Sequence, residues 1–292
     1  MDPILLALSY PSIDPVLVRF GPVEIRWYAL AYVGGLAFAW WFMRRLAGTQ
    51  RAGSRAGSRA GSRTLDDRAV DDLMFWAALG VIVGGRLGYV LFYKPGFYLA
   101  NPERIFALWQ GGMAFHGGLI GVALAIVLFC RKRRIDMFSA GDLAACAAPL
   151  GLLLGRLANF VNGELWGRVS DVPWAMVFPG GGPLPRHPSQ LYEAFLEGLL
   201  LLVVINLWRR RTGALDRPGE LAGLFCAGYG LARFVMEFFR QPDAFLPDSG
   251  FLFGFVTMGQ LLSLPLVALG IWLILRARNR AAAAVNPAAD DG

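Results

Sequence analysis

Among the ionisable side chains inside the long apolar runs of this 292-residue chain, five are candidates for a functional site: Arg86, His116, Arg156, Arg233 and Glu237. Placing such a group inside a bilayer costs about 2.5–3.5 kcal/mol, so each needs a partner or a function. Arginine binds phosphate through two parallel hydrogen bonds, and histidine exchanges a proton near neutral pH. Arg156 has no obvious counter-ion nearby in the sequence, so we infer an anionic ligand there, with phosphate the obvious choice.

Each of the other residues also has a structural interpretation. Arg233 and Glu237 are four residues apart and could neutralise each other on one helix. Arg86 could extend to the membrane surface, and His116 could be a buried, hydrogen-bonded side chain. No second histidine or carboxylate stands at ligand spacing from His116, so we expect no metal site.

Several common catalytic motifs are absent from the sequence: GxSxG, HExxH and GxxxxGK[ST]. Serine acyl-enzyme chemistry, metal-dependent hydrolysis and nucleotide use are therefore poorly supported. We expect no organic cofactor.

The composition indicates a membrane protein. Hydrophobic residues make up 56% of the chain, and the mean hydropathy is +0.48, above what soluble domains show. The formal charge of +7 does not indicate nucleic-acid binding, because the arginines cluster between apolar runs. The three cysteines, Cys130, Cys146 and Cys226, lie in apolar segments without CxxC spacing, so we expect buried structural thiols.

A bilayer core requires about 20 apolar residues per helix. This length predicts an all-α polytopic membrane protein with about seven transmembrane helices. The predicted spans cover residues 26–46, 72–93, 113–130, 138–158, 188–208, 219–239 and 254–275.

The basic residues predict the orientation. Most of the 28 lysines and arginines fall in connections on one side of the seven spans, including the Arg-rich loop 47–68 and the segment 131–134. Basic loops face the cytoplasm, so the N-terminus is predicted to be periplasmic and the C-terminus cytoplasmic. An arm at 94–112 and a loop at 159–187 then face the periplasm.

The sequence shows a simple domain organisation. We expect one membrane-embedded domain over residues 1–280 and a disordered tail at 281–292. The Ala-Gly-Ser-Arg repeats within residues 51–63 have no apolar period, so we expect a flexible loop there.

The helical rise predicts that the polar residues share one depth. With about 1.5 Å per residue, Arg86 and Arg233 lie roughly 21 Å, and Arg156 roughly 27 Å, above the cytoplasmic side of a core about 30 Å thick. Tyr28 and His116 lie within about one turn of the opposite surface. These groups therefore occupy the outer third of the bilayer, where lipid headgroups meet water.

Several motifs then resemble those of the prolipoprotein diacylglyceryl transferase family over about residues 10–278. They are Arg26-Trp27-Tyr28, Phe115-His116-Gly117-Gly118, Gly155 to Arg168, Arg186 to Glu193, and Gly228-Tyr229-Gly230 continuing to Arg233, Glu237 and Asp243. Ala158 and Ala29 stand where the family usually has glycine. The loop 159–187 is short for the family.

The resemblance implies a reaction and its partners. The lipobox cysteine of a preprolipoprotein attacks the glycerol carbon of phosphatidylglycerol that is bonded to the headgroup phosphate. A thioether forms and glycerol phosphate leaves. The expected partners are phosphatidylglycerol, the signal peptide and membrane lipids, in the bacterial inner membrane with the active site toward the periplasmic leaflet.

The resemblance also implies residue roles. His116 is expected to be the general base, although the sequence leaves an arginine open as the base. Arg156 and Arg233 are expected to form a catalytic phosphate clamp. The remaining expected contacts to phosphatidylglycerol come from Tyr28, Arg86, Asn159, Asn162, Glu164, Gly167, Tyr229 and Glu237. Glu164 and Glu237 are expected to orient the arginines.

Two other classes of protein fit the residue pattern. An anionic-solute transporter could use Arg86, Arg156 and Arg233 along its path, but Leu143–Leu154, in the inner half of its span, is nearly all apolar. A heptahelical protein that only binds anionic lipid is the other alternative. Activity that depends on a cysteine peptide would separate it from the enzyme.

Overall fold

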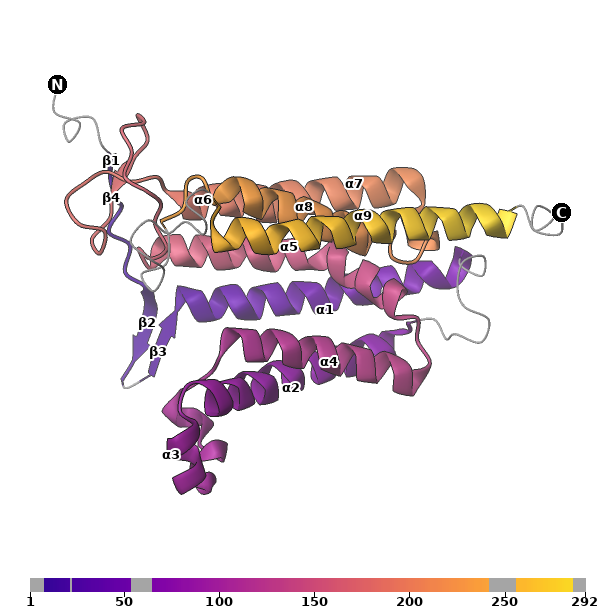
Figure 1. Ribbon diagram of the computed structural model, residues 1–292, viewed down its shortest axis with the longest axis horizontal. Coiled ribbons are helices and arrows are strands. Elements are labelled where there is room, and N and C mark those ends of the chain that lie inside the picture. Colours follow the sequence, from indigo (N-terminus) through magenta and orange to yellow (C-terminus); the bar gives the residue numbers. More distant parts are fainter. Residues whose placement is uncertain (1–7, 22, 54–64, 242–255, 286–292) are drawn as a thin grey trace. The chain divides into compact units, whose positions relative to one another are not determined.

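The computed structural model describes residues 8–21, 23–53, 65–241 and 256–285. It is mainly helical, as the sequence predicts (Figure 1). Long helical segments occupy all seven predicted spans: α1 (Trp27–Gly53), α2 (Asp67–Phe92), α4 (Phe115–Arg133), α5 (Met137–Val161), the continuous run of α6 (Ser189–Glu193), η4 (Ala194–Leu200) and α7 (Leu201–Thr212), α8 (Glu220–Met236), and α9 (Met258–Val285). The first two residues of the seventh predicted span lie outside the described residues.

Four of the described helical segments are both long and apolar enough to cross a bilayer: Asp67–Phe92, Met137–Val161, Ser189–Thr212 and Met258–Ala284. The protein therefore has the helical, membrane-compatible character expected from its composition. Helix α8 has 17 residues, somewhat fewer than the roughly 20 that span a hydrocarbon core.

The chain divides into two compact units. Unit 1 comprises Met1–Met43 and Gly141–Gly292, and unit 2 comprises Arg44–Ala140. Helices α1 and α5 each run from one unit into the other.

Unit 2 is built on close backbone contact between α2 and α4. A Cβ atom at Gly84 would lie 2.4 Å from the carbonyl oxygen of Gly117, and one at Gly80 would lie 2.6 Å from that of Gly121. Only glycine permits this approach, which is a common way for helices to pack in lipid. Helix α2 begins at a capping residue, Asp66, whose carboxylate accepts a hydrogen bond from the amide of Ala69 at 2.7 Å.

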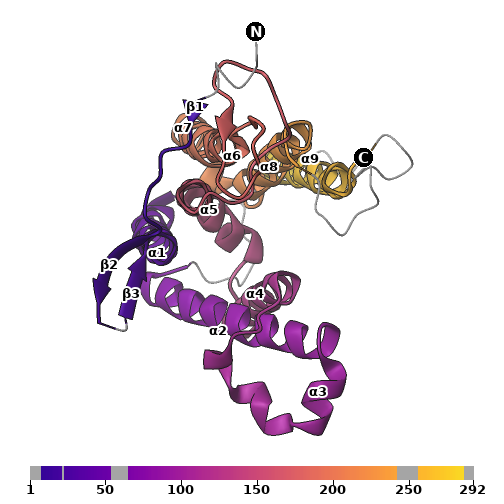
Figure 2. The same cartoon turned by 90° about the vertical axis from the view of Figure 1, so that its left-hand side faces the viewer.

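The predicted arm connects α2 and α4 in unit 2. It consists of three short helical turns, α3 (Pro95–Ala100), η2 (Pro102–Phe106) and η3 (Leu108–Gln110). The arm lies at the end of the α2–α4 pair where α2 ends and α4 begins (Figure 2).

In unit 1, α8 and α9 lie side by side (Figure 1). A Cβ atom at Gly223 would lie 2.7 Å from the carbonyl oxygen of Gly270. The fully buried Asp142 of α5 accepts hydrogen bonds from the amides of Gly219 and Ala222, at 2.8 and 2.7 Å, and so caps the start of α8. This cap ties α5 to α8 at the end opposite the polar cluster described below.

Four short strands were not predicted. Strand β1 (Leu8–Ser9) pairs in parallel with β4 (Met176–Val177), and β2 (Val16–Phe20) pairs antiparallel with β3 (Val23–Arg26). In the segment that joins β1 to β2, the Tyr10 hydroxyl donates hydrogen bonds to the carbonyl oxygens of Phe160 and Val161, at 2.6 and 2.8 Å. These carbonyls lie in the last turn of α5, where that of Phe160 also accepts a hydrogen bond from the amide of Gly163 at 2.9 Å, so Tyr10 provides a side-chain cap.

Two helices are longer than the sequence predicted. Helix α1 continues to Gly53, into the predicted Arg-rich loop, and α9 continues to Val285, into the predicted tail. Four consecutive alanines follow Arg280, and alanine has the highest helix propensity, which explains the extension of α9. Most of the Ala-Gly-Ser-Arg repeats and the last seven residues lie outside the described residues.

Candidate active site

Arg156, near the end of α5, has two carboxylate partners in unit 1. Its Nη1 atom lies 3.1 Å from Oε2 of Glu193, and its Nε and Nη2 atoms lie 3.3 and 3.2 Å from Oε2 of Glu197. The side chain is 18% exposed. The sequence showed no counter-ion near Arg156, and the structure supplies two that are distant in sequence, 37 and 41 positions later in the chain.

Both glutamates are fully buried and project from one helical run. Glu193 is the last residue of α6, and Glu197 lies in the π-helical segment η4. π-Helical turns are rare and occur frequently at functional sites. Burying two carboxylates is costly unless cations and hydrogen bonds compensate them, so the arginines and glutamates stabilise one another.

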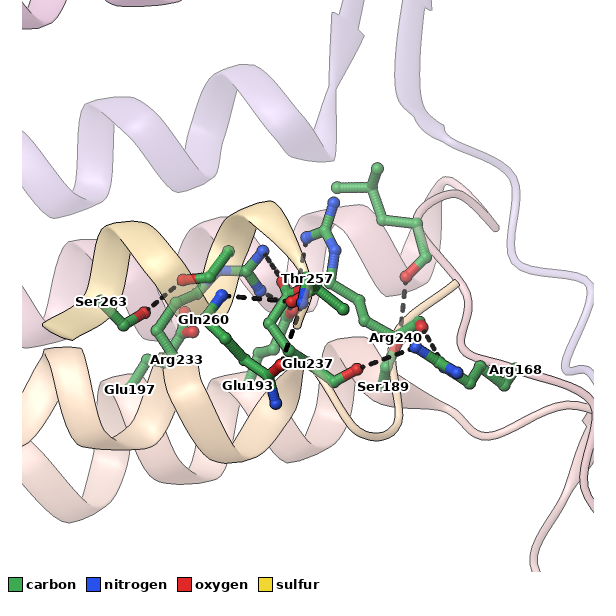
Figure 3. A network of polar contacts seen from close by, with 12 residues as sticks. Arg168, Ser189, Glu193, Glu197, Arg233, Glu237, Arg240, Thr257, Gln260 and Ser263 are labelled. Carbon is green, nitrogen blue, oxygen red and sulfur yellow. Dashed lines mark hydrogen bonds and ion pairs between the residues drawn. The ribbon is translucent and has the colours of Figure 1, made fainter. Parts of the chain in front are cut away.

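Arg233 brings α8 to the same carboxylates. Its Nη1 atom lies 3.3 Å from Oε1 of Glu193, and its Nη2 atom pairs with Oε1 of Glu237 one turn later. Arg240 adds a third cation, with Nη1 3.4 Å from Oε1 of Glu193. The Glu193 carboxylate thus contacts three arginines. Figure 3 labels Glu193, Glu197, Arg233, Glu237 and Arg240 of this arginine–glutamate cluster.

The segment after Glu237 is held against the loop 159–187. Arg168 donates hydrogen bonds to the carbonyl oxygens of Arg240 and Glu237, at 2.9 and 3.4 Å. Gly167 packs so closely here that a Cβ atom would lie 2.5 Å from the carbonyl oxygen of Phe239. Gly167, a predicted substrate contact, is therefore buried at a backbone crossing that a larger residue would obstruct.

A second polar group follows Arg156 at the end of α5. The side-chain amides of Asn159 and Asn162 donate to Oε1 of Glu164, at 2.9 and 3.1 Å. In the described residues Glu164 is thus held by two asparagines, whereas the sequence predicted that it orients an arginine. Tyr28 interacts with the Asn159 side chain, and its hydroxyl lies 3.2 Å from that of Tyr32.

The residue after Glu164 has an unusual backbone conformation. Leu165 has φ of 60°, the left-handed region that is costly for a residue with a Cβ atom. Two buried side chains of α6 hold this turn: Gln190 donates to the carbonyl of Glu164 at 2.6 Å, and Ser189 donates to that of Leu165 at 2.9 Å. Such strain is typical of functional sites with a supporting structure around them.

Tyr229 also faces the arginine–glutamate cluster. It lies near enough to Glu197, Arg156 and Arg233 for electrostatic interaction, and its ring stacks on Phe225 with centroids 5.8 Å apart. Unit 1 thus brings together the following predicted site residues: Tyr28, Arg156, Asn159, Asn162, Glu164, Gly167, Tyr229, Arg233 and Glu237.

Unit 2 contains the other two predicted site residues. Arg86 is only 4% exposed, and its guanidinium engages the arm. It donates to the backbone carbonyls of Arg104, Ile105, Ala107, Gly111 and Gly112. His116 lies in the first turn of α4, and its side chain is outside the described part of the structure.

Glu193 and Glu197 are the main site residues that the sequence analysis missed. A signal was available: both are carboxylates inside the predicted span 188–208, where ionisable groups are as costly as the arginines. Arg240 and Arg168 were missed as well, since they lie outside the predicted apolar spans.

Beside the cluster, His187 contacts an aromatic group. Its Nδ1 atom lies 3.2 Å from the Tyr192 hydroxyl, and its ring packs edge-on against Phe239. Burial lowers the pKa of His187 below its ordinary value of 6.5, while the charge of Asp171 opposes that shift. Neutral imidazole is therefore favoured here.

Metal ligation finds no support among the described side chains: no group of three histidine, cysteine, aspartate or glutamate residues is placed to hold an ion. Cys130 and Cys146 are buried free thiols, and Cys226 is partly buried. The candidate site is thus a set of arginines, carboxylates, amides and phenols.

Comparison with known proteins gives a consistent result. A family model described as prolipoprotein diacylglyceryl transferase matches residues 15–276. Proteins named phosphatidylglycerol–prolipoprotein diacylglyceryl transferase are similar over most of the chain. The protein from Rhodospirillum rubrum is 56% identical over 94% of this chain and 96% of its own length. That from Paramagnetospirillum magneticum is 55% identical over 95% and 98%, and that from Brucella canis is 53% identical over 95% and 96%.

Proposed function

Because this chain belongs to the prolipoprotein diacylglyceryl transferase family, we propose that the arginine–glutamate cluster of unit 1 is its active site. The enzyme transfers the diacylglyceryl group of phosphatidylglycerol to a prolipoprotein, the first step of lipoprotein maturation. The observation that carries the assignment is that Arg156 and Arg233, from two helices, share the buried carboxylate of Glu193.

This shared carboxylate is suited to preorganising a phosphate clamp. An arginine has five N–H donors, and the contacts to glutamate use only some of them in Arg156 and Arg233. The remaining donors can bind a phosphate, because the glutamates have already fixed the positions of the two arginines. Preorganised donors of this kind stabilise charge that develops in a transition state.

The proposed chemistry is one displacement. The cysteine sulfur forms a bond to the glycerol carbon while the bond from that carbon to the phosphate oxygen breaks. Glycerol phosphate leaves with the electron pair, and the thiol proton passes to a base. Arg156 and Arg233 stabilise the negative charge on the leaving phosphate.

The proposed base is His116. A thiol is a weak nucleophile until it loses its proton, and imidazole titrates near neutral pH. A His116→Gln variant is expected to lose transfer activity together with the acidic limb of its pH–rate profile. An unchanged rate and profile would assign the proton transfer to another group.

The other predicted contacts receive supporting roles in this proposal. Tyr28, Asn159, Asn162 and Tyr229 offer hydroxyl and amide groups to the headgroup. Glu237 orients Arg233 through their ion pair, and Glu164 orients the two asparagines. Gly167 is required for the close packing at the edge of the site. For Arg86, the contacts to the arm support a role in holding the arm.

The membrane arrangement is also part of the proposal. All seven long helical segments are proposed to span the inner membrane, with the N-terminus periplasmic and the C-terminus cytoplasmic. The distribution of basic loops supports this orientation. The active site then faces the periplasmic leaflet, where it meets phosphatidylglycerol, other membrane lipids and the signal peptide of a preprolipoprotein.

The decisive experiment follows both products in one assay. Purified protein receives phosphatidylglycerol labelled in its headgroup glycerol and a lipobox peptide, and labelled glycerol phosphate is measured together with the peptide mass. Arg156→Ala and Arg156→Lys are each expected to lower the rate about 10²–10³-fold, since lysine supplies no fork. Arg211→Ala, at an exposed arginine in the last turn of α7, serves as the matched control.

Two results would contradict the assignment of the site. One is full activity in Arg156→Lys, which would show that the reaction does not require a bidentate clamp at this position. The other is equal loss in Arg156→Ala and Arg211→Ala, which would indicate a general effect of removing arginine. A Cys→Ser peptide must give no product in any of these reactions.

A further inference from the structure

Glu197 has one carboxylate oxygen with a partner and one without. Its Oε2 atom accepts hydrogen bonds from Nε and Nη2 of Arg156, at 3.3 and 3.2 Å. Its Oε1 atom is buried and has no hydrogen-bond donor among the described residues. The residue as a whole has no exposed surface.

An open acceptor of this kind requires a donor. An ionised carboxylate only accepts hydrogen bonds, and leaving a buried acceptor unsatisfied is unfavourable. Native structures rarely tolerate such atoms without a ligand, an ordered water or a function. Because Glu197 touches Arg156 and interacts with Arg233, a donor that fills the position lies beside the proposed phosphate clamp.

We propose that Oε1 of Glu197 accepts a hydrogen bond from a hydroxyl group of the substrate headgroup, and that Glu197 thereby selects glycerol. This inference rests on the proposed function of the cluster. The ligand must combine an anionic phosphate with a hydroxyl donor a few bonds away. The headgroup of phosphatidylglycerol has both, since its terminal glycerol carries two hydroxyls next to the phosphodiester.

A second buried acceptor does not compete for the same hydroxyl. Oε1 of Gln190 also lacks a described donor, but Gln190 precedes Glu197 by about two helical turns, or roughly 10 Å along the axis. Its amide nitrogen is bound to the carbonyl of Glu164. Oε2 of Glu193 also has no hydrogen-bond partner among the described residues, but it already forms an ion pair with Nη1 of Arg156 at 3.1 Å. Oε1 of Glu197 is therefore the open acceptor next to the arginines.

The test compares two lipids that differ only in the headgroup hydroxyls. Transfer from phosphatidylglycerol and from phosphatidylpropanol to the same lipobox peptide is measured with one enzyme preparation. The unmodified enzyme is expected to prefer phosphatidylglycerol by roughly 10- to 100-fold, because phosphatidylpropanol leaves Oε1 unpaired. In Glu197→Gln the amide oxygen stays toward Arg156 and an NH2 group replaces the acceptor, so the preference is expected to fall to within about threefold.

The readout is a ratio of two rates, so a partly unfolded preparation does not distort it. Glu220→Gln is the matched control, because Glu220 is a buried glutamate paired with Arg217 and Arg278 away from the cluster. It is expected to keep the full preference. If Glu197→Gln gives no folded protein, Glu197→Asp, which keeps the charge but withdraws the acceptor, is expected to reduce the preference.

The outcomes separate the two proposals. Equal rates with both lipids in the unmodified enzyme would overturn the role of Glu197 and leave the transferase assignment intact. An unchanged preference in Glu197→Gln or Glu197→Asp would overturn it equally. Absence of transfer from either lipid by folded, unmodified protein would instead overturn the proposed function.

Discussion

The side-chain amide of Gln190 holds the carbonyl oxygen of Glu164 at 2.6 Å, across 26 residues of sequence. The bond fixes the turn in which Leu165 takes a left-handed conformation. Glu164 stands immediately before that residue and accepts hydrogen bonds from Asn159 and Asn162. A strained turn in the loop 159–187 is thereby coupled to the polar end of α5.

Removing the Gln190 amide should release this strain. Gln190→Ala is expected to lower the free energy of unfolding by about 1–3 kcal/mol, since the Glu164 carbonyl loses its buried partner. In a Leu165→Gly background the loss should be larger, because glycine adopts positive φ without the Cβ penalty and no released strain offsets the lost hydrogen bond. Denaturation of the four proteins in one detergent measures the coupling. Additive effects within about 0.5 kcal/mol would show that the two residues are independent.

Arg86 should control the order of the arm. Its guanidinium satisfies backbone carbonyls of η2, of Ala107 and of the two glycines that follow η3. Arg86→Ala leaves these carbonyls without that donor, so amide hydrogen exchange over residues 95–112 is expected to accelerate about 10- to 100-fold.

The matched control for the arm is Arg104→Ala, which removes an exposed arginine from the arm itself. Its exchange pattern should resemble that of the unmodified protein. Unchanged exchange in Arg86→Ala would mean that the arm keeps its conformation without this side chain.

His187 should make stability depend on pH in the acidic range. Burial lowers its pKa below 6.5, so the unfolded chain binds the proton more readily than the folded one. The contribution of neutral His187 is complete above pH 6.5 and is lost as the pH falls through the unfolded and then the folded pKa. His187→Phe should reduce this acid-side loss in thermal unfolding between about pH 7.5 and pH 5. Identical pH dependence in both proteins would assign the loss to other groups.

The contact between α2 and α4 should not tolerate a methyl group. Gly84→Ala would place a Cβ atom 2.4 Å from the Gly117 carbonyl oxygen, forcing the helices apart at a cost of about 1–3 kcal/mol. Gly96→Ala, with nothing within 4 Å of the added atom, is the control. Equal thermal stability of the two variants would contradict the close packing.

Local sequence signals predicted the helices well and the site only in part. Apolar runs of bilayer length placed all seven long helical segments, and the spacing of Arg233 and Glu237 indicated a pair that the structure contains. The rise per residue gave a depth for Arg156 but not the direction of its side chain around the helix. Its pairing with Glu193 and Glu197 depends on how α5 packs against the α6–η4 run, which no local pattern encodes.

Other features had no sequence signal of their own. A π-helical turn uses the same residue types as an α-helix, so η4 was not predictable from propensity. Leucine gives no sign of a left-handed conformation, and Leu165 adopts it only because Gln190 and Ser189 hold the turn. Strand β1 has two residues and finds its partner β4 far along the chain, beyond the reach of a pattern with a period of two.

The tie between the beginning of the chain and the end of α5 has a consequence for biosynthesis. Tyr10 emerges from the ribosome well before Phe160 and Val161, whose carbonyls it caps, and β1 waits still longer for β4. The N-terminal segment therefore cannot reach its final place until the four long helices α1, α2, α4 and α5 have been made. A newly synthesised chain therefore passes through a period in which strand β1 is unpaired, and completion of the site is among the last events of its assembly.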